Sequence, residues 1–291
     1  MTNNVLTKNA LQLFPFPFTI CLIGLIVQTV LARTRIRMSD SAGKDSPSYA
    51  AVFPNAVAVT CSFVFHRIAL MNGSVGLTIT AKSMSTVFVA LQSAFLFGES
   101  LSTRSRLGIL CVVGGVALSS ATDGTFRWVC FVSALLSGLS VSIKVVLNKR
   151  TLLHFGSRCD PRMIYFRTIS LATALTTPIC LAFEGRAVLV HANSVLGDSD
   201  LTTLYTLLGP LLLSGFGLAW MEMASFSVVR LVTPTTHAVC NGARSLSIIL
   251  FSIMYYRTPT SMQRFLGIFF AVAGCFLYAT DFNQKKKRKE K

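Results

Sequence analysis

Carboxylates are scarce in this chain of 291 residues, which has 11 Asp and Glu against 27 Lys and Arg. Charged residues make up only 13% of it, whereas a water-soluble domain carries about 25%. Hydrophobic residues make up 52%, with 22 Phe among them, which is more apolar surface than one buried core can hold. The composition excludes an ordinary soluble enzyme and indicates a chain that faces lipid.

The sequence also lacks the motifs of catalysis and metal binding. It has no CxxC pair, no P-loop, no HExxH and no nucleophile beside a base. Its eight cysteines are scattered and lie mostly in apolar stretches, which favours small buried side chains. We therefore expect no enzyme, no metal and no cofactor. Nucleic acid is not expected as a partner either. The basic residues behind the net charge of +16 lie between apolar runs and at the C-terminus, and do not form one face of a folded domain.

Apolar runs long enough to cross about 30 Å of hydrocarbon as helices predict about nine membrane spans. They are residues 14–32, 49–71, 75–97, 105–121, 126–148, 161–183, 203–229, 232–256 and 262–280. The predicted fold is an all-α polytopic membrane protein. Residues 1–281 would form a single transporter domain, and residues 282–291 a basic cytosolic tail.

The connections between the spans divide by charge, which predicts their orientation. The basic connections are Arg33 to Lys44, Arg104 to Arg106, Lys149 to Arg158 and the tail from Lys285 to Lys291. Basic connections face the cytosol, so the C-terminus is predicted to be cytosolic and the first span to enter from the other side. We expect that a leading span is missing. The first residues have no Arg- and Ser-rich presequence character, which weakens import into an organelle.

Two segments of the chain, residues 75–123 and 232–281, can be overlaid at an offset of about 159. The overlay places Leu107-Gly108-Ile109 on Leu266-Gly267-Ile268 and Gly115 on Gly274. The copies are five spans apart, so the second would run through the membrane in the opposite direction, as in many secondary transporters. The predicted halves are residues 1–123 and 124–281. The alternative is a chance match between two glycine-containing apolar segments.

Ionisable side chains inside the predicted spans are functional candidates, because a charge at that depth is costly in lipid. They are Lys82, Lys144, Arg167, Glu222 and Arg244, with His237 as a titratable neighbour. Two polar triplets have the i, i+4, i+7 spacing of one helix face, and the offset of the repeat lays one on the other. They are Thr78, Lys82 and Ser85, and His237, Asn241 and Arg244.

Cations that meet in one cavity with at most one carboxylate would suit a phosphate or a diphosphate. The predicted substrate-binding residues are Lys82, Arg244, Lys144, His237, Thr78 and Asn241. Other interpretations stay open: an ion pair of Glu222 with Arg244, a Lys144 side chain that reaches the headgroups, and a packing role for His237. His66 and Arg67 are expected to anchor the chain at the membrane interface.

Several motifs follow one another along nearly the whole chain. They are Asn9-Ala10-Leu11, Phe14-Pro15-Phe16-Pro17, Phe53-Pro54, Thr78 to Glu99, Gly114 to Leu118 and Thr233 to Arg244. In this order they resemble the triose-phosphate translocator family of the drug/metabolite transporter superfamily. That resemblance implies ten helices in two inverted five-helix halves, with ligand-binding positions at Lys82, Lys144, His237 and Arg244.

The chain departs from the plastid members of that family at three places. It has Arg244-Ser245 where they have Lys-Arg, Met221 near the position of a Tyr, and Ile79 in place of a His. The family also includes nucleotide-sugar transporters of the Golgi and the endoplasmic reticulum. The departures favour a carrier of nucleotide sugars or other phosphorylated sugars, or a loss of activity.

The C-terminal residues 287–291 resemble the cytosolic KxKxx retrieval signal, with Lys287 and Lys289 as its lysines. A plain basic tail that binds anionic lipid is the alternative. A retrieval signal would imply the Golgi or the endoplasmic reticulum, and a coat protein as a partner.

The predicted function is secondary-active antiport of phosphorylated sugars or nucleotide sugars by alternating access. The expected partners are phosphate-bearing small molecules and the lipid bilayer, and a homodimer is left open. One rival is a transport-inactive membrane scaffold. The other is an exporter of neutral or cationic compounds, for which Glu222 would be the main residue.

Overall fold

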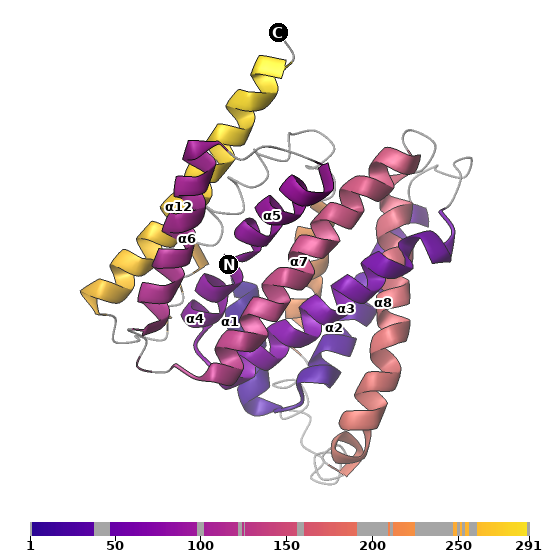
Figure 1. Cartoon of the computed structure of the whole chain (residues 1–291). Helices are drawn as coiled ribbons and strands as arrows, with labels where there is room; N and C mark the ends of the chain where they lie inside the picture. Colours follow the sequence, from indigo (N-terminus) through magenta and orange to yellow (C-terminus); the bar gives the residue numbers. More distant parts are fainter. Residues whose placement is uncertain are drawn as a thin grey trace. The chain divides into compact units, whose positions relative to one another are not determined.

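The computed structural model describes residues 2–37, 47–97, 102–121, 124, 126–155, 160–190, 209, 212–224, 247–248, 251, 254–255 and 261–289. The elements in these ranges are helices, and no strand occurs in them (Figure 1). The main ones are α1 (Thr2–Leu13), α2 (Pro17–Arg37), α3 (Tyr49–Asn72), α4 (Val75–Lys82), α5 (Ser85–Phe97), α6 (Thr103–Ala121), α7 (Trp128–Phe155), α8 (Pro161–Phe183) and α12 (Met262–Lys289). The predicted all-α fold is confirmed.

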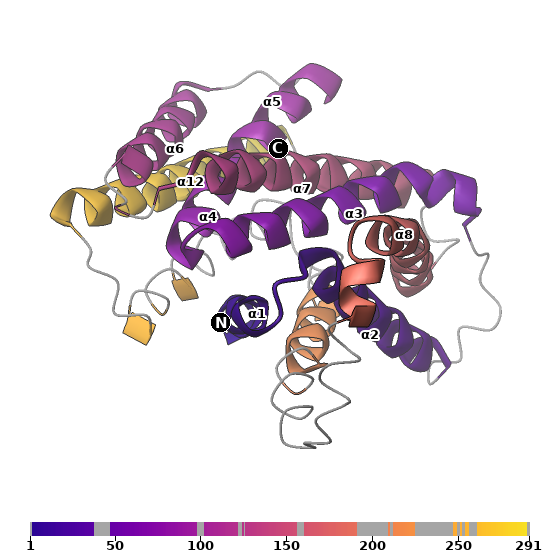
Figure 2. The ribbon, with the colours of Figure 1, turned by 90° about the horizontal axis from the view of Figure 1, so that it is seen from below.

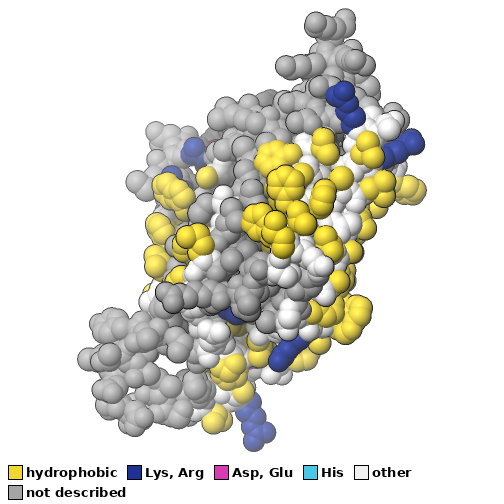
Figure 3. All heavy atoms as spheres, turned by 90° about the vertical axis from the view of Figure 1, so that its left-hand side faces the viewer, with side chains coloured by type: hydrophobic (Ala, Val, Ile, Leu, Met, Phe, Trp, Pro, Cys, Tyr) yellow, Lys and Arg dark blue, Asp and Glu magenta, His cyan; other side chains and the backbone are white. Residues whose placement is uncertain are grey.

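Four of the described helices are long and apolar enough to cross a membrane: Pro17–Ile36, Tyr49–Asn72, Trp128–Asn148 and Arg162–Phe183. Shorter apolar helices cover Arg106–Ala121, Leu212–Ala224 and Phe265–Leu277. Large apolar side chains also lie on the outside, and Figure 3 shows many of them on one face. Because lipid is the solvent in which such a surface is stable, the chain is an integral membrane protein.

The chain forms two compact units, each built from one early and one late piece of the sequence. Unit 1 contains Asn72–Val146 and Ser227–Lys291, and unit 2 contains Thr2–Met71 and Leu147–Phe226. The predicted repeat halves, residues 1–123 and 124–281, do not coincide with these compact units. They remain a prediction.

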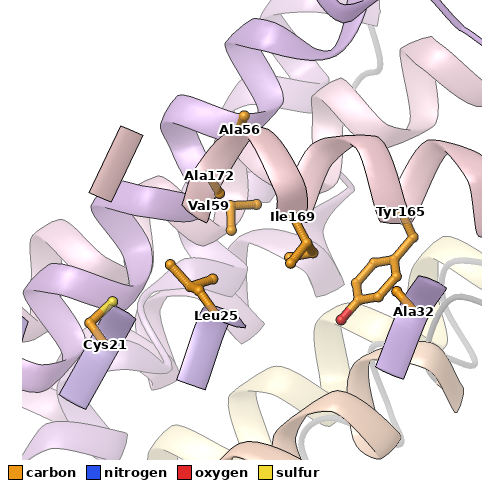
Figure 4. Packing of buried hydrophobic residues seen from close by; sticks show 8 residues of the cluster. All are labelled: Cys21, Leu25, Ala32, Ala56, Val59, Tyr165, Ile169 and Ala172. Carbon is orange, nitrogen blue, oxygen red and sulfur yellow. The ribbon is translucent and has the colours of Figure 1, made fainter. Parts of the chain in front are cut away.

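Unit 2 packs α2, α3 and α8 around an apolar core. Leu25 of α2, Val59 of α3 and Ile169 of α8 point toward one another there (Figure 4). Small side chains at Ala56 and Ala172 let the helices approach closely. The buried contacts among these three helices form the core of the unit.

In unit 1, α6 and α12 lie side by side in Figures 1 and 2 and make contact through bare backbone. A Cβ atom built on Gly115 would lie 2.4 Å from the nitrogen of Ala271 and 2.5 Å from the carbonyl oxygen of Gly267. Only glycine fits such an approach, as at close helix pairs in membranes.

The contact between α6 and α12 is reciprocal. A Cβ atom on Gly274 would meet the nitrogen of Val112 at 2.7 Å and the carbonyl oxygen of Gly108 at 2.5 Å. This contact repeats the previous one at the offset of the repeat. Gly274, Ala271 and Gly267 each lie 159 positions after Gly115, Val112 and Gly108. The order of the contacts reverses along the two helices, so they are antiparallel. Two copies inserted in opposite directions would produce this pattern, so the contacts agree with the predicted repeat.

The structure departs from the predicted spans at three places. Residues 75–97, predicted as one span, are the two helices α4 and α5. A helix also covers Thr2–Leu13, where none was predicted, and α12 continues through the basic tail to Lys289. The predicted span 203–229 contains the helical residues 212–224, and most of 232–256 lies outside the described residues.

Candidate functional site

The break between α4 and α5 follows Lys82 directly. The N–H of Ser83 donates to the carbonyl oxygens of Ile79 and Thr80, at 3.0 and 3.1 Å, and the N–H of Met84 donates to Ala81 at 3.1 Å. Bonds to the third residue back tighten the last turn and end the regular α-helix. The hydroxyl of Ser83 also donates to the carbonyl oxygen of Thr80, at 2.6 Å. Hydrogen bonds of this kind compete with the helix ladder and bend it.

The break packs against α7 at a glycine. A Cβ atom built on Gly138 would lie 3.2 Å from the carbonyl oxygen of Lys82 and 3.5 Å from the nitrogen of Ser85. Few real side chains approach backbone so closely, so the bare face of α7 is fitted to the interruption. Broken helices that line a polar site are a common feature of secondary transporters. Lys82, which is half-buried at this point, is therefore in a setting typical of a binding site.

The helix α7 carries a polar face on the same unit. Ser133, Ser137, Ser140 and Lys144 follow one another at spacings of four, three and four residues, and the three serines are buried. This spacing keeps them on one side of the helix. Nearby, the side-chain amide of Gln92 in α5 donates to the hydroxyl of Ser142, at 3.0 Å. The serine spacing is visible in the sequence, but the sequence prediction included only Lys144.

Thr78 is completely buried, and its hydroxyl is already engaged. It donates to the carbonyl oxygen of Ser74 at 2.9 Å and lies 3.6 Å from the thiol of Cys130. A direct contact of Thr78 with a ligand would require these side chains to move. In this structure the residue supports the start of α4, which Ser74 caps by accepting from the N–H of Leu77.

The second predicted triplet, His237, Asn241 and Arg244, lies outside the described residues. Its assignment as part of the substrate site stays a prediction. The lysines of the predicted retrieval signal, Lys287 and Lys289, belong to the last turn of α12.

Arg167 has structural partners in unit 2. Its guanidinium donates to the carbonyl oxygen of Pro47 and stacks over the ring of Tyr49, 4.7 Å from the ring centre. These contacts fasten the segment before α3 to α8. Arg167 is thus placed by protein groups rather than directed at an open space.

Glu222, the carboxylate that the sequence places inside a span, is half-buried in the helical residues 212–224. It lies within electrostatic range of Tyr165, whose hydroxyl donates to the side chain of Gln28 at 3.2 Å. Gln28 is fully buried and donates to the carbonyl oxygen of Gly24 at 3.1 Å. Unit 2 therefore contains a polar group of its own, in which Tyr165 and Gln28 were not part of the sequence prediction.

The prediction of interface anchors at His66 and Arg67 is wrong. Both are buried, with 9% and 3% of their surface exposed. One ring nitrogen of His66 lies 3.3 Å from the side-chain oxygen of Asn4 in α1. The helix α1, which the sequence did not predict, is what covers this end of α3.

Several known proteins are similar to this chain over nearly its whole length. The model of the Triose-phosphate Transporter family matches residues 1–279. The phosphoenolpyruvate/phosphate translocator 1, chloroplastic, of Oryza sativa subsp. japonica is 29% identical over 98% of this chain and 70% of its own length. The triose phosphate/phosphate translocator, non-green plastid, chloroplastic, of Brassica oleracea var. botrytis is 27% identical over 98% of this chain and 71% of its own.

A solved structure supports the fold independently. It is described only as a crystal structure of a protein, and it superposes with a TM-score of 0.55 at 14% sequence identity. The match covers 95% of this chain and 93% of the other. From the family match over nearly its whole length, this chain belongs to the Triose-phosphate Transporter family.

Proposed function

We propose that this protein is a secondary-active antiporter of phosphate-bearing small molecules, working by alternating access. One structural observation carries the proposal: the helix predicted as a single span is interrupted at Lys82, and the interruption is packed on Gly138. Family membership supports the same function, because relatives of this chain are named as translocators that exchange a phosphorylated compound and phosphate.

The chemistry of the break suits an anion. The ammonium group of Lys82 and the amino end of α5 both place positive charge beside the interruption. Lys144 follows Gly138 by six residues, a rise of about 9 Å along α7. A phosphate group with two negative charges would offset cations that are costly to keep in a membrane.

The second half of the proposed site is formed by Arg244, His237 and Asn241. The offset of the repeat supports their inclusion, because it places them on Ser85, Thr78 and Lys82. The reciprocal glycine contacts of α6 and α12 support the same offset. In this proposal Lys82 and Arg244 hold the phosphate, and the other residues orient the rest of the substrate.

Small phosphorylated compounds and inorganic phosphate are the first substrates to test, because the names of the relatives contain them. Nucleotide sugars are a second candidate, favoured by Ser245 in place of a cation and by the apolar, buried Ile79. A Golgi or endoplasmic reticulum location rests on Lys287 and Lys289 alone. Replacing both with serine in the tagged full chain should then release it from the early secretory pathway, and an unchanged distribution would contradict that location.

The function is tested by counter-exchange in proteoliposomes loaded with inorganic phosphate. Wild-type protein should take up labelled phosphate or a phosphate ester only when the inside holds an exchangeable phosphate compound. Lys82→Met and Arg244→Ala should each lower the exchange rate roughly thirtyfold, which corresponds to about 2 kcal/mol for a lost charge-assisted hydrogen bond. Arg106→Met, which removes an exposed cation of α6, is the matched control.

The rival functions predict different results. Exchange at the wild-type rate in Lys82→Met would remove this site from the mechanism. Correctly inserted wild-type protein that exchanges no phosphate compound and no nucleotide sugar would favour the scaffold. Uptake of neutral or cationic compounds that depends on Glu222 would favour the exporter.

A further inference from the structure

Arg67 is a buried cation in the span Tyr49–Asn72 of unit 2. Only 3% of its surface is exposed. In the described part of the chain, no group accepts a hydrogen bond from its Nε atom. Removing a guanidinium from water costs several kcal/mol unless an anion and hydrogen bonds compensate, and a membrane span makes that requirement stricter.

The bare backbone of α2 lies beside this guanidinium. Across from it on α2 stands Gly24, where a Cβ atom would lie 3.8 Å from the Nη2 atom of Arg67. The guanidinium therefore faces bare backbone at this point. Cys21, one turn earlier on α2, lies within electrostatic range, but its buried thiol supplies no formal charge to offset a cation.

Among the described acidic residues of unit 2, the buried carboxylate is engaged at the start of α2. Glu184 is a buried carboxylate of the same unit, and its two oxygens accept hydrogen bonds from Phe18 and Thr19 at the amino end of α2. A role as an interface anchor does not fit either, because such a side chain keeps its charged group in water. The guanidinium is built into the unit, with Nη2 near Gly24 and with Nε lacking an acceptor among the described residues.

We propose that Arg67 is an anion-binding position of unit 2 and that its ligand is a phosphate-type oxyanion. The Nε and one Nη atom of a guanidinium form a donor edge that matches two oxygens of a phosphate in a bidentate contact. A halide offers both donors only one atom and one charge, so it should bind more weakly. The position goes beyond the proposed transport site, which is argued from Lys82 and Arg244. The phosphate group belongs either to a solute or to an anionic lipid headgroup.

Thermal unfolding of the full chain in a neutral, phosphate-free detergent tests this position. The background is Lys82→Met, so that the proposed transport site does not contribute. Inorganic phosphate should still raise the unfolding temperature, whereas chloride at equal ionic strength should not. Adding Arg67→Met should abolish the response, and Arg67→Lys should raise the phosphate concentration at half-response roughly tenfold, since it loses the bidentate edge.

A second variant keeps the test independent of whether Arg67→Met folds. Gly24→Ala adds a methyl group into the space beside Nη2 at an ordinary contact distance, so the cation and the fold are kept. It should weaken the phosphate response severalfold. Gly217→Ala, in the same unit, has no atom within 4 Å of the added methyl group and should leave the response unchanged.

The source of the phosphate group is distinguished by a parallel titration with phosphatidic acid, whose headgroup is a phosphate monoester. Stabilisation by free phosphate alone assigns the position to a solute, and stabilisation by phosphatidic acid alone assigns it to lipid. The inference is overturned if neither stabilises the Lys82→Met protein, or if Arg67→Met responds as strongly as its parent.

The transport proposal fails separately. Phosphate exchange by Lys82→Met at the wild-type rate would contradict the proposed transport site. That result would leave the binding measurement at Arg67 unaffected.

Discussion

The carboxylate of Glu184 accepts hydrogen bonds from both the backbone N–H and the hydroxyl of Thr19, each at 2.7 Å. The N–H of Phe18 donates to the same carboxylate at 2.9 Å. The first N–H groups of a helix have no partner within the helix, and Pro17 at the start of α2 removes one of them. Glu184 satisfies two more from a distance of 165 residues in the sequence. The start of α2 and the end of α8 therefore lie on the same side of the membrane.

Glu184→Ala is expected to lower the free energy of unfolding by about 2–3 kcal/mol, because two N–H groups would be buried without an acceptor. Glu184→Gln, which keeps one acceptor oxygen, should lose about half as much. Denaturation of the purified protein by increasing SDS measures both. Arg186→Ala, an exposed change in the next turn, should stay within about 0.5 kcal/mol of wild type. Equal stability of Glu184→Ala and this control would disprove the capping role.

The glycine contact between α6 and α12 predicts a second set of effects. Gly115→Ala, Gly267→Ala and Gly274→Ala each place a methyl group within 2.4–2.6 Å of backbone atoms, so each should destabilise the fold by about 3 kcal/mol or more. Gly114→Ala is the matched control, because nothing lies within 4 Å of its added methyl group. Yield and unfolding temperature of the four purified variants check the contrast. Similar behaviour of Gly114→Ala and Gly115→Ala would refute it.

Gly138 predicts a link between α7 and the proposed site. Gly138→Ala requires the backbone at Lys82 to move by a few tenths of an ångström, and Gly138→Leu requires a larger shift. Phosphate exchange per correctly folded carrier should fall slightly in the first and at least about tenfold in the second, since small displacements of a binding group are costly. Gly114→Leu should leave exchange unchanged. Full exchange by folded Gly138→Leu would show that the break does not position the substrate.

Arg167 is predicted to act in structure and not in transport. Arg167→Leu removes the contact with the Tyr49 ring and the hydrogen bond to Pro47, and should lower stability by about 1–2 kcal/mol. Exchange measured per folded carrier should stay near the wild-type value. A strong loss of exchange without a loss of stability would instead make Arg167 a ligand-binding residue.

Most of the fold follows from the sequence because apolar length is a strong signal. Residues 49–71, 126–148 and 161–183 were predicted within a few residues of α3, the apolar part of α7 and α8. The break after Lys82 could not be predicted in this way, because residues 82–84 contain neither glycine nor proline. It depends on the serine at position 83 and on the close approach of Gly138, and only the first is local to the segment.

The candidate site was predicted in part. Lys82 and Lys144 lie on helices that fit a binding role, whereas the hydroxyl of Thr78 is engaged within its own helix. The prediction for Arg67 was wrong because its position near the end of the span indicated a residue at the membrane–water interface. Its burial depends on tertiary packing, including the approach of Gly24 in α2, which the local sequence does not contain.

The reciprocal packing of Gly115 on α12 and of Gly274 on α6 has a consequence for how such a carrier evolves. In the predicted inverted repeat, the surface of α6 that receives α12 would be complementary to its own copy turned upside down. A protein with only one half could form this helix contact only as a dimer of two molecules inserted in opposite directions. Fusion of two such halves in one chain would remove the need for insertion in both directions. Every molecule would then contain both orientations.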